Sequence, residues 1–242
     1  MANRMDAIIT ISQQSKVDIQ RYLHVEEGKI NVTALAARDG FHIQKDDEVE
    51  ETIQQIGIER PYIVFIGSIE PRKNLVRLLE AYKELLKWST KWKLVIVGSS
   101  NYWKGSLVEK KVEQLGIKDK VIFTGYVKDA DLPAIYNGAD LFCFPSLYEG
   151  FGLPVLEAMA CGTPVITSKC SSLPEVVGEA AVLVDPFNVN EIFSAMRRIL
   201  SEPELARELH KRGLERVAHF SWERTAHETI AVYEKVLGEK LS

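Results

Sequence analysis

The chain of 242 residues has few cysteines, no long apolar run and no cluster of basic residues. Its three cysteines, Cys143, Cys161 and Cys170, lack metal-ligand spacing, which argues against a disulfide framework or a zinc site. No stretch reaches about 18 apolar residues, so the sequence predicts no membrane span. The N-terminus lacks a basic segment followed by an apolar run, so we expect no signal peptide. We therefore expect a cytoplasmic protein, and peripheral docking at the inner membrane face stays open.

The formal net charge is −4, and the lysines and arginines form no run. Nucleic-acid binding needs clustered basic residues that neutralise phosphates, so we expect no nucleic-acid partner. Hydrophobic residues make up 46% of the chain and charged residues 26%, which is the balance of an ordinary globular protein. The length is sufficient for one large domain or two small ones.

Residues 1–60 contain too few predicted elements for a complete domain. The predicted elements are a strand at 7–12, a helix from Ser12 or Ser15 to Leu23 with Ile19, Tyr22 and Leu23 on one face, a strand at 29–35, and a short helix ending near Ile56. One strand, one helix and one strand cannot form a sheet with both faces covered. We interpret this segment as the remnant of a Rossmann-like domain followed by a linker, and we expect it to be sticky or dimerising.

Residues 61–217 alternate regularly between short apolar runs and amphipathic segments. We predict strands at 62–67, 93–98, 121–125, 140–145, 163–168 and 180–185, and helices that begin near Leu75, Lys104 and Asp129 or Asp131, follow the loop after 145, and span 188–201 and 203–217. Such alternation predicts an α/β domain with a doubly wound parallel sheet. Residues 218–242 form a separate helix capped by Ser221, whose expected apolar contacts come from Trp222, Thr225, Ile230, Tyr233 and Val236.

The segment 145–164, PSLYEGFGLPVLEAMACGTP, is the most informative in the chain. A predicted strand runs into a loop bracketed by Gly150 and Gly152, and Pro154 then suits the first turn of a helix. Helix N-termini at the carboxyl edge of an α/β sheet favour anions such as phosphate. Two carboxylates, Glu149 and Glu157, frame the loop. The alternative interpretation is that the glycines form a tight turn and Glu157 complements the helix dipole.

The turn at 67–74, GSIEPRKN, places two cations directly before a predicted helix. Positive charge at a helix N-terminus opposes the helix dipole unless an anion lies nearby. The positions of Arg72 and Lys73 therefore favour phosphate binding over a solvated surface.

The motif YEGFGLPVLEAMACGTPVI, which contains E-x7-E, resembles the signature of retaining nucleotide-sugar glycosyltransferases of the GT-B fold, in glycosyltransferase family 4. The turn at 67–74 resembles the family's arginine and lysine loop. The resemblance covers nearly the whole chain, but only the C-terminal, donor-binding half of the family pattern. It implies transfer of a hexose from a donor such as UDP-glucose or GDP-mannose to a glycan or glycolipid acceptor, with retention of configuration, in polysaccharide biosynthesis.

The resemblance also implies roles for individual residues. Lys73 would contact the donor diphosphate with Arg72 beside it, and Glu149 would contact the sugar and stabilise charge at the anomeric carbon. Ser68 stands where the family usually has arginine, so the second cationic contact is lost, supplied by Arg72, or replaced by a hydroxyl. The segment 171–186 resembles the next segment of the family, and we expect a structural role for its Glu175, because an acid is favoured at a helix start.

The nucleotide part of the donor would lie along neighbouring strand ends. Glu157 would hold the ribose, and the base would lie near Gly98 and Ser99 and the turn at Gly125, Tyr126 and Val127. The loop backbone at Gly150, Phe151, Gly152 and Leu153 would meet the pyrophosphate. Lysine, arginine and the helix dipole would then supply the positive charge that a metal supplies elsewhere, so we expect no metal and no cofactor beyond the donor substrate.

Three alternatives stay open. The chain could be the donor-binding half of a split or truncated enzyme that is inactive without an N-terminal domain or partner chain. It could be a GT-B epimerase or phosphorylase, although the glycine loop and paired glutamates favour a transferase. It could also be a regulatory module that binds the donor without turnover.

Overall fold

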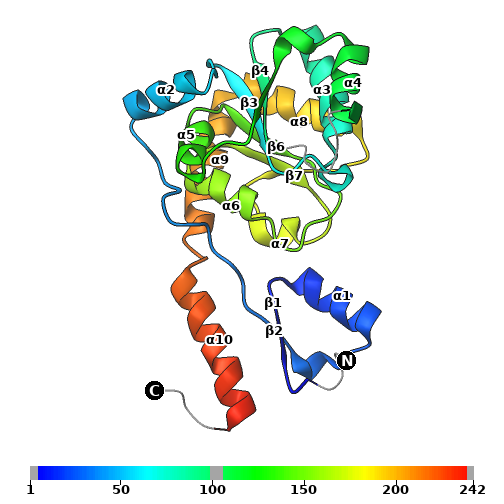
Figure 1. Cartoon of the computed structure of the whole chain (residues 1–242), viewed down its shortest axis with the longest axis vertical. Helices are drawn as coiled ribbons and strands as arrows, with labels where there is room; N and C mark the ends of the chain where they lie inside the picture. The colour runs from blue at the N-terminus through cyan, green and yellow to red at the C-terminus, as the bar shows by residue number, and fades with distance from the viewer. Residues whose placement is uncertain (1–4, 99–105, 239–242) are drawn as a thin grey trace.

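The computed structural model describes residues 5–98 and 106–238. The N-terminal part forms a small parallel unit in which α1 (Gln13–Leu23) connects β1 (Ile8–Thr10) to β2 (Ile30–Val32). The side chain of Ser12 accepts a hydrogen bond from the backbone N–H of Ser15, so Ser12 is the N-cap of α1. The predicted strand, helix and strand are thus confirmed, and Figure 1 shows this unit apart from the main sheet.

The main sheet has six parallel strands in the order β5-β4-β3-β6-β7-β8. They are β3 (Tyr62–Ile66), β4 (Lys93–Val97), β5 (Val121–Gly125), β6 (Leu141–Phe144), β7 (Val165–Ser168) and β8 (Val182–Val184). Every residue of β3, β6 and β7 is buried, as expected for parallel strands covered on both faces. The strand order reverses direction between β3 and β6, which confirms the doubly wound sheet.

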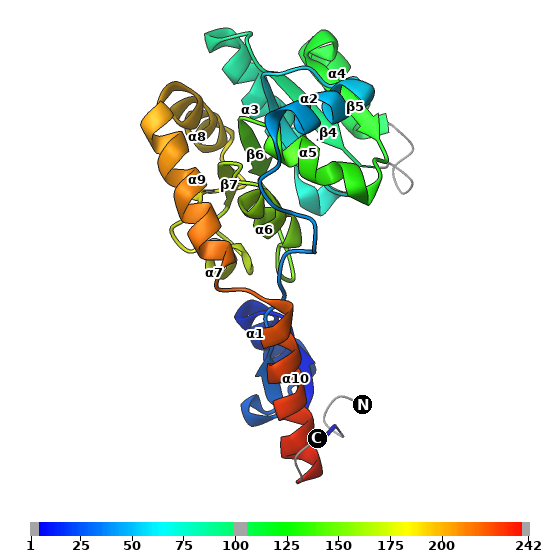
Figure 2. The same ribbon diagram turned by 90° about the vertical axis from the view of Figure 1, so that its left-hand side faces the viewer.

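Helices cover both faces of this sheet (Figure 2). One group of helices that pack together consists of α3 (Leu75–Trp88), α4 (Ser106–Leu115) and α8 (Val189–Ser201). The second group consists of α2 (Asp46–Gln55), α5 (Leu132–Asn137), α6 (Leu153–Ala160) and α9 (Pro203–Val217). The short α7 (Leu173–Val177) packs beside α6. The helix predicted to begin near Lys104 starts at Ser106, and Lys104 lies outside the described residues.

The last helix, α10 (Trp222–Leu237), runs from the six-stranded unit to the small N-terminal unit (Figure 1). Its cap, Ser221, accepts a hydrogen bond from Arg224 N as predicted. Within the described residues no helix has the length and apolar character needed to cross a membrane.

On α10, the expected contact residues Trp222 and Thr225 bond the backbone of Ala37 and Ala34, whereas much of the apolar face is open to solvent. On α10 the exposed side chains include Trp222, Ile230, Tyr233 and Val236, and only Val232 is buried. On α1, Tyr22 and Leu23 are exposed. The physical reason is that the small unit has only two strands, so these faces project past the elements that could cover them.

Candidate functional site

The carboxyl ends of β3 and β6 lie side by side where the strand order reverses. The turn after β3 contains a short helix, η3 (Pro71–Lys73), and Glu149 lies in the loop after β6. Lys73 Nζ is 2.6 Å from Glu149 Oε1, and Arg72 Nη1 is 3.0 Å from Glu149 Oε2. The three predicted catalytic residues, although far apart in sequence, therefore form one ion-paired group.

Lys73 and Glu149 are both withdrawn from solvent, with side chains that are 7% and 9% exposed. Burial lowers the pKa of Lys73, and the Glu149 carboxylate opposes part of that shift. The Lys73 ammonium also lies 4.6 Å from the centre of the Phe144 ring, at the end of β6. Lys73 is thus a buried cation held by a carboxylate and an aromatic face.

The guanidinium of Arg72 joins two carboxylates, since its Nε is 2.8 Å from Glu70 Oε2. A hydrogen bond from Ser68, followed by the contact with Arg72, lowers the pKa of Glu70. Arg72 thus lies beside Lys73 at Glu149, while the three alternatives left by Ser68 for the contact with the diphosphate stay open. The cations before α3 already have Glu149 and Glu70 as anions, so their charge by itself does not require a phosphate.

The glycine loop has the backbone geometry that the sequence predicts. Gly152 has φ +118°, and a Cβ at this position would lie 2.9 Å from Leu173 Cδ2, so any other residue would be strained. Pro154 lies in the first turn of α6, whose first N–H groups have no partner within the helix. Phe151 is buried against Leu156, which fixes the loop on the helix. The start of α6 thus faces the carboxyl edge of the sheet.

Glu157 lies within α6 and is 3% exposed. Its Oε1 is 2.7 Å from Arg38 Nε, and its Oε2 accepts a longer hydrogen bond of 3.4 Å from the hydroxyl of Tyr136. Arg38 also pairs with Asp129, at 2.9 Å. Sequence reasoning missed Arg38, which lies in the linker before α2 and carries no motif that would mark it.

From the sequence we expected no Asp-x-Asp metal motif, but Asp129 and Asp131 form such a triplet in the short helix η5 (Asp129–Asp131). Asp129 is paired with Arg38 instead. Within the described residues, no three His, Cys, Asp or Glu side chains are grouped as metal ligands.

The predicted base-binding residues lie at the ends of β4 and β5. A Cβ on Gly98 would lie 2.0 Å from the carbonyl oxygen of Gly67, so the two strand ends approach as only glycine allows. Val127 is buried and Tyr126 is 76% exposed. Ser99, which was expected beside Gly98, lies outside the described residues.

The small N-terminal unit contacts the glycine loop through side chains that the sequence did not identify. The hydroxyl of Ser15 donates to the carbonyl of Gly150 at 3.1 Å, and Tyr148 donates to Asp18 at 2.7 Å. Glu175, expected to be structural, accepts hydrogen bonds from two backbone N–H groups at the N-terminus of α1, at 3.0 and 3.1 Å. These contacts join α1 to the predicted donor side of the sheet.

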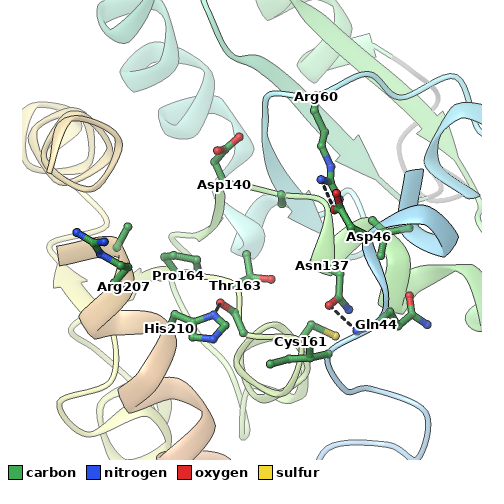
Figure 3. Close-up of a pocket in the computed structure, with 15 residues that line it drawn as sticks. Gln44, Asp46, Arg60, Asn137, Asp140, Cys161, Thr163, Pro164, Arg207 and His210 are labelled. Carbon is green, nitrogen blue, oxygen red and sulfur yellow. Dashed lines mark hydrogen bonds and ion pairs between the residues drawn. The ribbon is translucent and has the colours of Figure 1, made fainter. Parts of the chain in front are cut away.

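A pocket of about 470 Å³ lies at the edge of the sheet opposite to Glu149, at the amino ends of β6 and β7 (Figure 3). Its polar groups make several bonds with one another. Arg60 pairs with Asp46 at 2.6 Å, Gln44 N donates to Asn137 Oδ1 at 3.0 Å, and His210 Nδ1 is 2.7 Å from Gly162 O. Because ligands of doubly wound sheets bind beyond the carboxyl ends, the ion-paired group at Glu149 is the stronger candidate.

Comparison with known proteins shows which family this fold belongs to. A family model for glycosyl transferases group 1 matches residues 47–216. The O-antigen chain mannosyltransferase B of Escherichia coli is 36% identical over 229 residues, which are 94% of this chain and 60% of that protein. The chain therefore spans less than two thirds of this relative.

Two solved structures agree with the family match. The sucrose-phosphate synthase of Thermosynechococcus elongatus superposes with a TM-score of 0.84 at 28% identity, over 98% of this chain and 59% of that one. The C-terminal domain of a group 1 glycosyl transferase family protein from Francisella tularensis superposes with a TM-score of 0.67 at 26% identity, over 76% of this chain and 97% of that domain. The chain belongs to the group 1 glycosyl transferases, and its six-stranded unit has the fold of their C-terminal GT-B domain.

Proposed function

We propose that this chain carries the donor site of a retaining hexosyltransferase, which moves a hexose from a nucleoside-diphosphate sugar to a glycan or glycolipid acceptor. The observation that carries the proposal is the ion-paired group at the reversal point of the sheet, in which Lys73 and Glu149 are buried and Arg72 is partly exposed. Two cations beside the N-terminus of α6 suit a diphosphate, and a carboxylate beside them suits sugar hydroxyls.

In this proposal the leaving diphosphate is bound by Lys73, Arg72 and the backbone N–H groups at residues 150–153. Negative charge develops on the diphosphate as the glycosidic bond breaks, and fixed cations and N–H groups stabilise that charge without reorganising. Removal of one such group typically slows the reaction by about 10²–10³-fold. A metal ion is not part of the proposed mechanism.

Glu149 stabilises positive charge at the anomeric carbon in this scheme and contacts the sugar. We do not assign it as a nucleophile, because its two oxygens are engaged by Lys73 and Arg72. Glu157 binds the ribose hydroxyls, for which its contact with Arg38 leaves further lone pairs on the carboxylate. The base lies near Gly98 and Tyr126.

The donor sugar and the acceptor follow from the relatives. The E. coli relative is named as a mannosyltransferase of O-antigen chains, so a mannosyl donor is the first to test, with a glucosyl donor second. We propose a glycan or lipid-linked acceptor on the cytoplasmic side of the membrane. The proposed organisation is an N-terminal remnant with linker (1–60), the donor domain (61–217) and a crossing helix (218–242).

A second candidate is the same donor site without turnover by this chain alone. It is favoured by the position of the ion-paired group wholly within residues 61–217, since donor binding there does not by itself require transfer. Release of labelled hexose from the donor, to water or to an acceptor, separates the two candidates.

Calorimetric titration with UDP, GDP and ADP tests the proposal. We expect saturable binding of one nucleotide, weakened about ten-fold or more by Lys73→Ala and by Glu157→Ala. Lys211→Ala, which removes an exposed lysine on α9, is the control and should bind as the wild type does. Absence of binding by folded wild-type protein to all three nucleotides would contradict the proposed donor site.

A further inference from the structure

The loop between β7 and α7 reaches back to the backbone of Glu149. Its residue Ser171 has φ +59°, a left-handed conformation that residues with a side chain rarely adopt. In this conformation the Ser171 hydroxyl lies against both backbone polar groups of Glu149. It accepts a hydrogen bond from Glu149 N at 3.0 Å and donates one to Glu149 O.

Ser172 adds a second hydroxyl to the same backbone. Its Oγ is 2.9 Å from Glu149 O and 2.8 Å from Phe151 O, and the residue is fully buried. A hydroxyl has one proton, so Ser172 bonds one of these carbonyls at a time and stays within reach of both. The next residue, Leu173, lies against Gly152. Three consecutive residues, Ser171 to Leu173, therefore contact the glycine loop at Glu149, Phe151 and Gly152.

The contacts matter because the loop is intrinsically flexible. Gly150 and Gly152 give its backbone more freedom than other residues would. The carboxylate of Glu149 is held by Lys73 and Arg72, whereas its backbone is held by the two serines. Without the serines, the side chain would stay paired while the main chain could shift beneath it. Such a shift would change where the carboxylate and the loop N–H groups meet a ligand.

We propose that Ser171 and Ser172 are positioning residues that fix the Glu149 backbone in its donor-binding geometry and so determine the affinity for the sugar part of the donor. This inference rests on the proposed function, in which Glu149 contacts the sugar while Glu157 holds the ribose. Nucleotide recognition should therefore depend less on the serine pair than sugar recognition does.

The experiment compares two ligands on each protein variant. Dissociation constants are measured for UDP with UDP-glucose and for GDP with GDP-mannose, using the wild type, Ser171→Gly and Ser172→Ala. Glycine tolerates the left-handed backbone at position 171 and removes the hydroxymethyl group, and with it both hydrogen bonds to Glu149. Tyr82→Phe is the matched control, because the Tyr82 hydroxyl is also buried and also reaches two carbonyls, Trp92 O at 2.8 Å and Lys120 O at 3.0 Å, near the opposite edge of the sheet.

We expect each serine variant to weaken binding of the nucleotide-sugar about ten-fold more than binding of the matching nucleotide. Tyr82→Phe should lower the thermal midpoint but leave the ratio of the two constants unchanged. If Ser172→Ala does not fold, the ratio measured for Ser171→Gly tests the proposal, because Ser171 is only partly buried and its loss is less harmful to the fold.

Two negative results have different meanings. If the wild type binds a nucleotide and its sugar but the ratio is unchanged in Ser171→Gly and Ser172→Ala, the positioning role is wrong and the donor site stands. If folded wild-type protein binds neither ligand of either pair, nor ADP, the proposed function and this inference are both wrong.

Discussion

Losing Glu149 should affect Lys73 more than losing Lys73 affects Glu149, because the two side chains have different numbers of ion-pair partners. Glu149 pairs with both Lys73 and Arg72, whereas the one carboxylate in the described residues that pairs with Lys73 is Glu149. A buried charge that loses its partner is strongly destabilising. Removing the carboxylate should therefore harm the fold more than removing the lysine.

We predict that Glu149→Gln lowers the free energy of unfolding by about 3 kcal/mol, because it leaves Lys73 buried without a carboxylate. Lys73→Met should cost less, because Glu149 keeps Arg72. Urea unfolding of both variants measures the difference. Equal losses, or a larger loss for Lys73→Met, would show that the pair is not buried as the structure describes.

The meeting of Lys73 with Glu149 could be predicted from the sequence, whereas the contact of Arg38 with Glu157 could not. The first pair follows apolar strands, and the carboxyl ends of parallel strands share one edge of a sheet. Arg38 reaches Glu157 only because of the path that the linker takes between the two units, and no local pattern encodes that path. By the same reasoning, Ser171 and Ser172 could have been placed near Glu149, since they follow β7 and so lie at the same edge of the sheet. In that segment only Glu175 was considered from the sequence.

At the scale of the elements, the ends of β3 and β4 approach each other closely because Gly98 has no side chain. Gly98 has φ +149°, and its Cα faces the carbonyl of Gly67. We predict that Gly98→Ala lowers the free energy of unfolding by on the order of 3 kcal/mol, because the methyl group must displace backbone. Gly28→Ala is the control, since a Cβ there meets no atom within 4 Å. Thermal unfolding that is equally altered in both variants would contradict the close approach.

The attachment of α1 to the glycine loop should be visible at alkaline pH. The hydrogen bond to Asp18, with a contribution from burial, raises the pKa of Tyr148 to about 12, from the ordinary 10.0. A raised folded-state pKa means that the contact stabilises the protein fully below pH 10.0 and that this contribution is lost as the pH rises toward about 12.

We predict that Asp18→Asn shifts the ionisation of one tyrosine toward its ordinary pKa, because the carboxylate no longer opposes a phenolate. Spectrophotometric titration of tyrosinate in the two proteins measures the shift. Asp6→Asn, which changes an exposed carboxylate before β1, should leave the titration unchanged. Coincident curves for Asp18→Asn and wild type would mean that Tyr148 does not bond Asp18.

At the scale of the whole molecule, the order and type of the predicted elements are confirmed, and the apolar faces of α1 and α10 are largely exposed. Periodicity identifies an apolar face without indicating whether another element covers it. In the six-stranded unit both faces have helices, whereas β1 and β2 pair only with each other. A groove of about 310 Å³ remains between β1 and α10, lined by Met5, Asp6, Ala7, Ile9, Val232, Tyr233, Val236 and Leu237.

This exposed surface predicts self-association of the chain. Tyr233 and Leu237 are 51% and 59% exposed at the groove, and contiguous apolar surface of this kind is removed from water when two copies meet. Sedimentation velocity should show a weight-average mass that rises with concentration, and an apolar dye should bind and fluoresce. Tyr233→Lys combined with Leu237→Glu should abolish both effects, since charges at the groove would lose hydration on contact. Tyr126→Ser removes an aromatic ring that is 76% exposed and does not line the groove, so it should change neither. A wild-type monomer at all concentrations without dye binding would show that the groove is closed in solution.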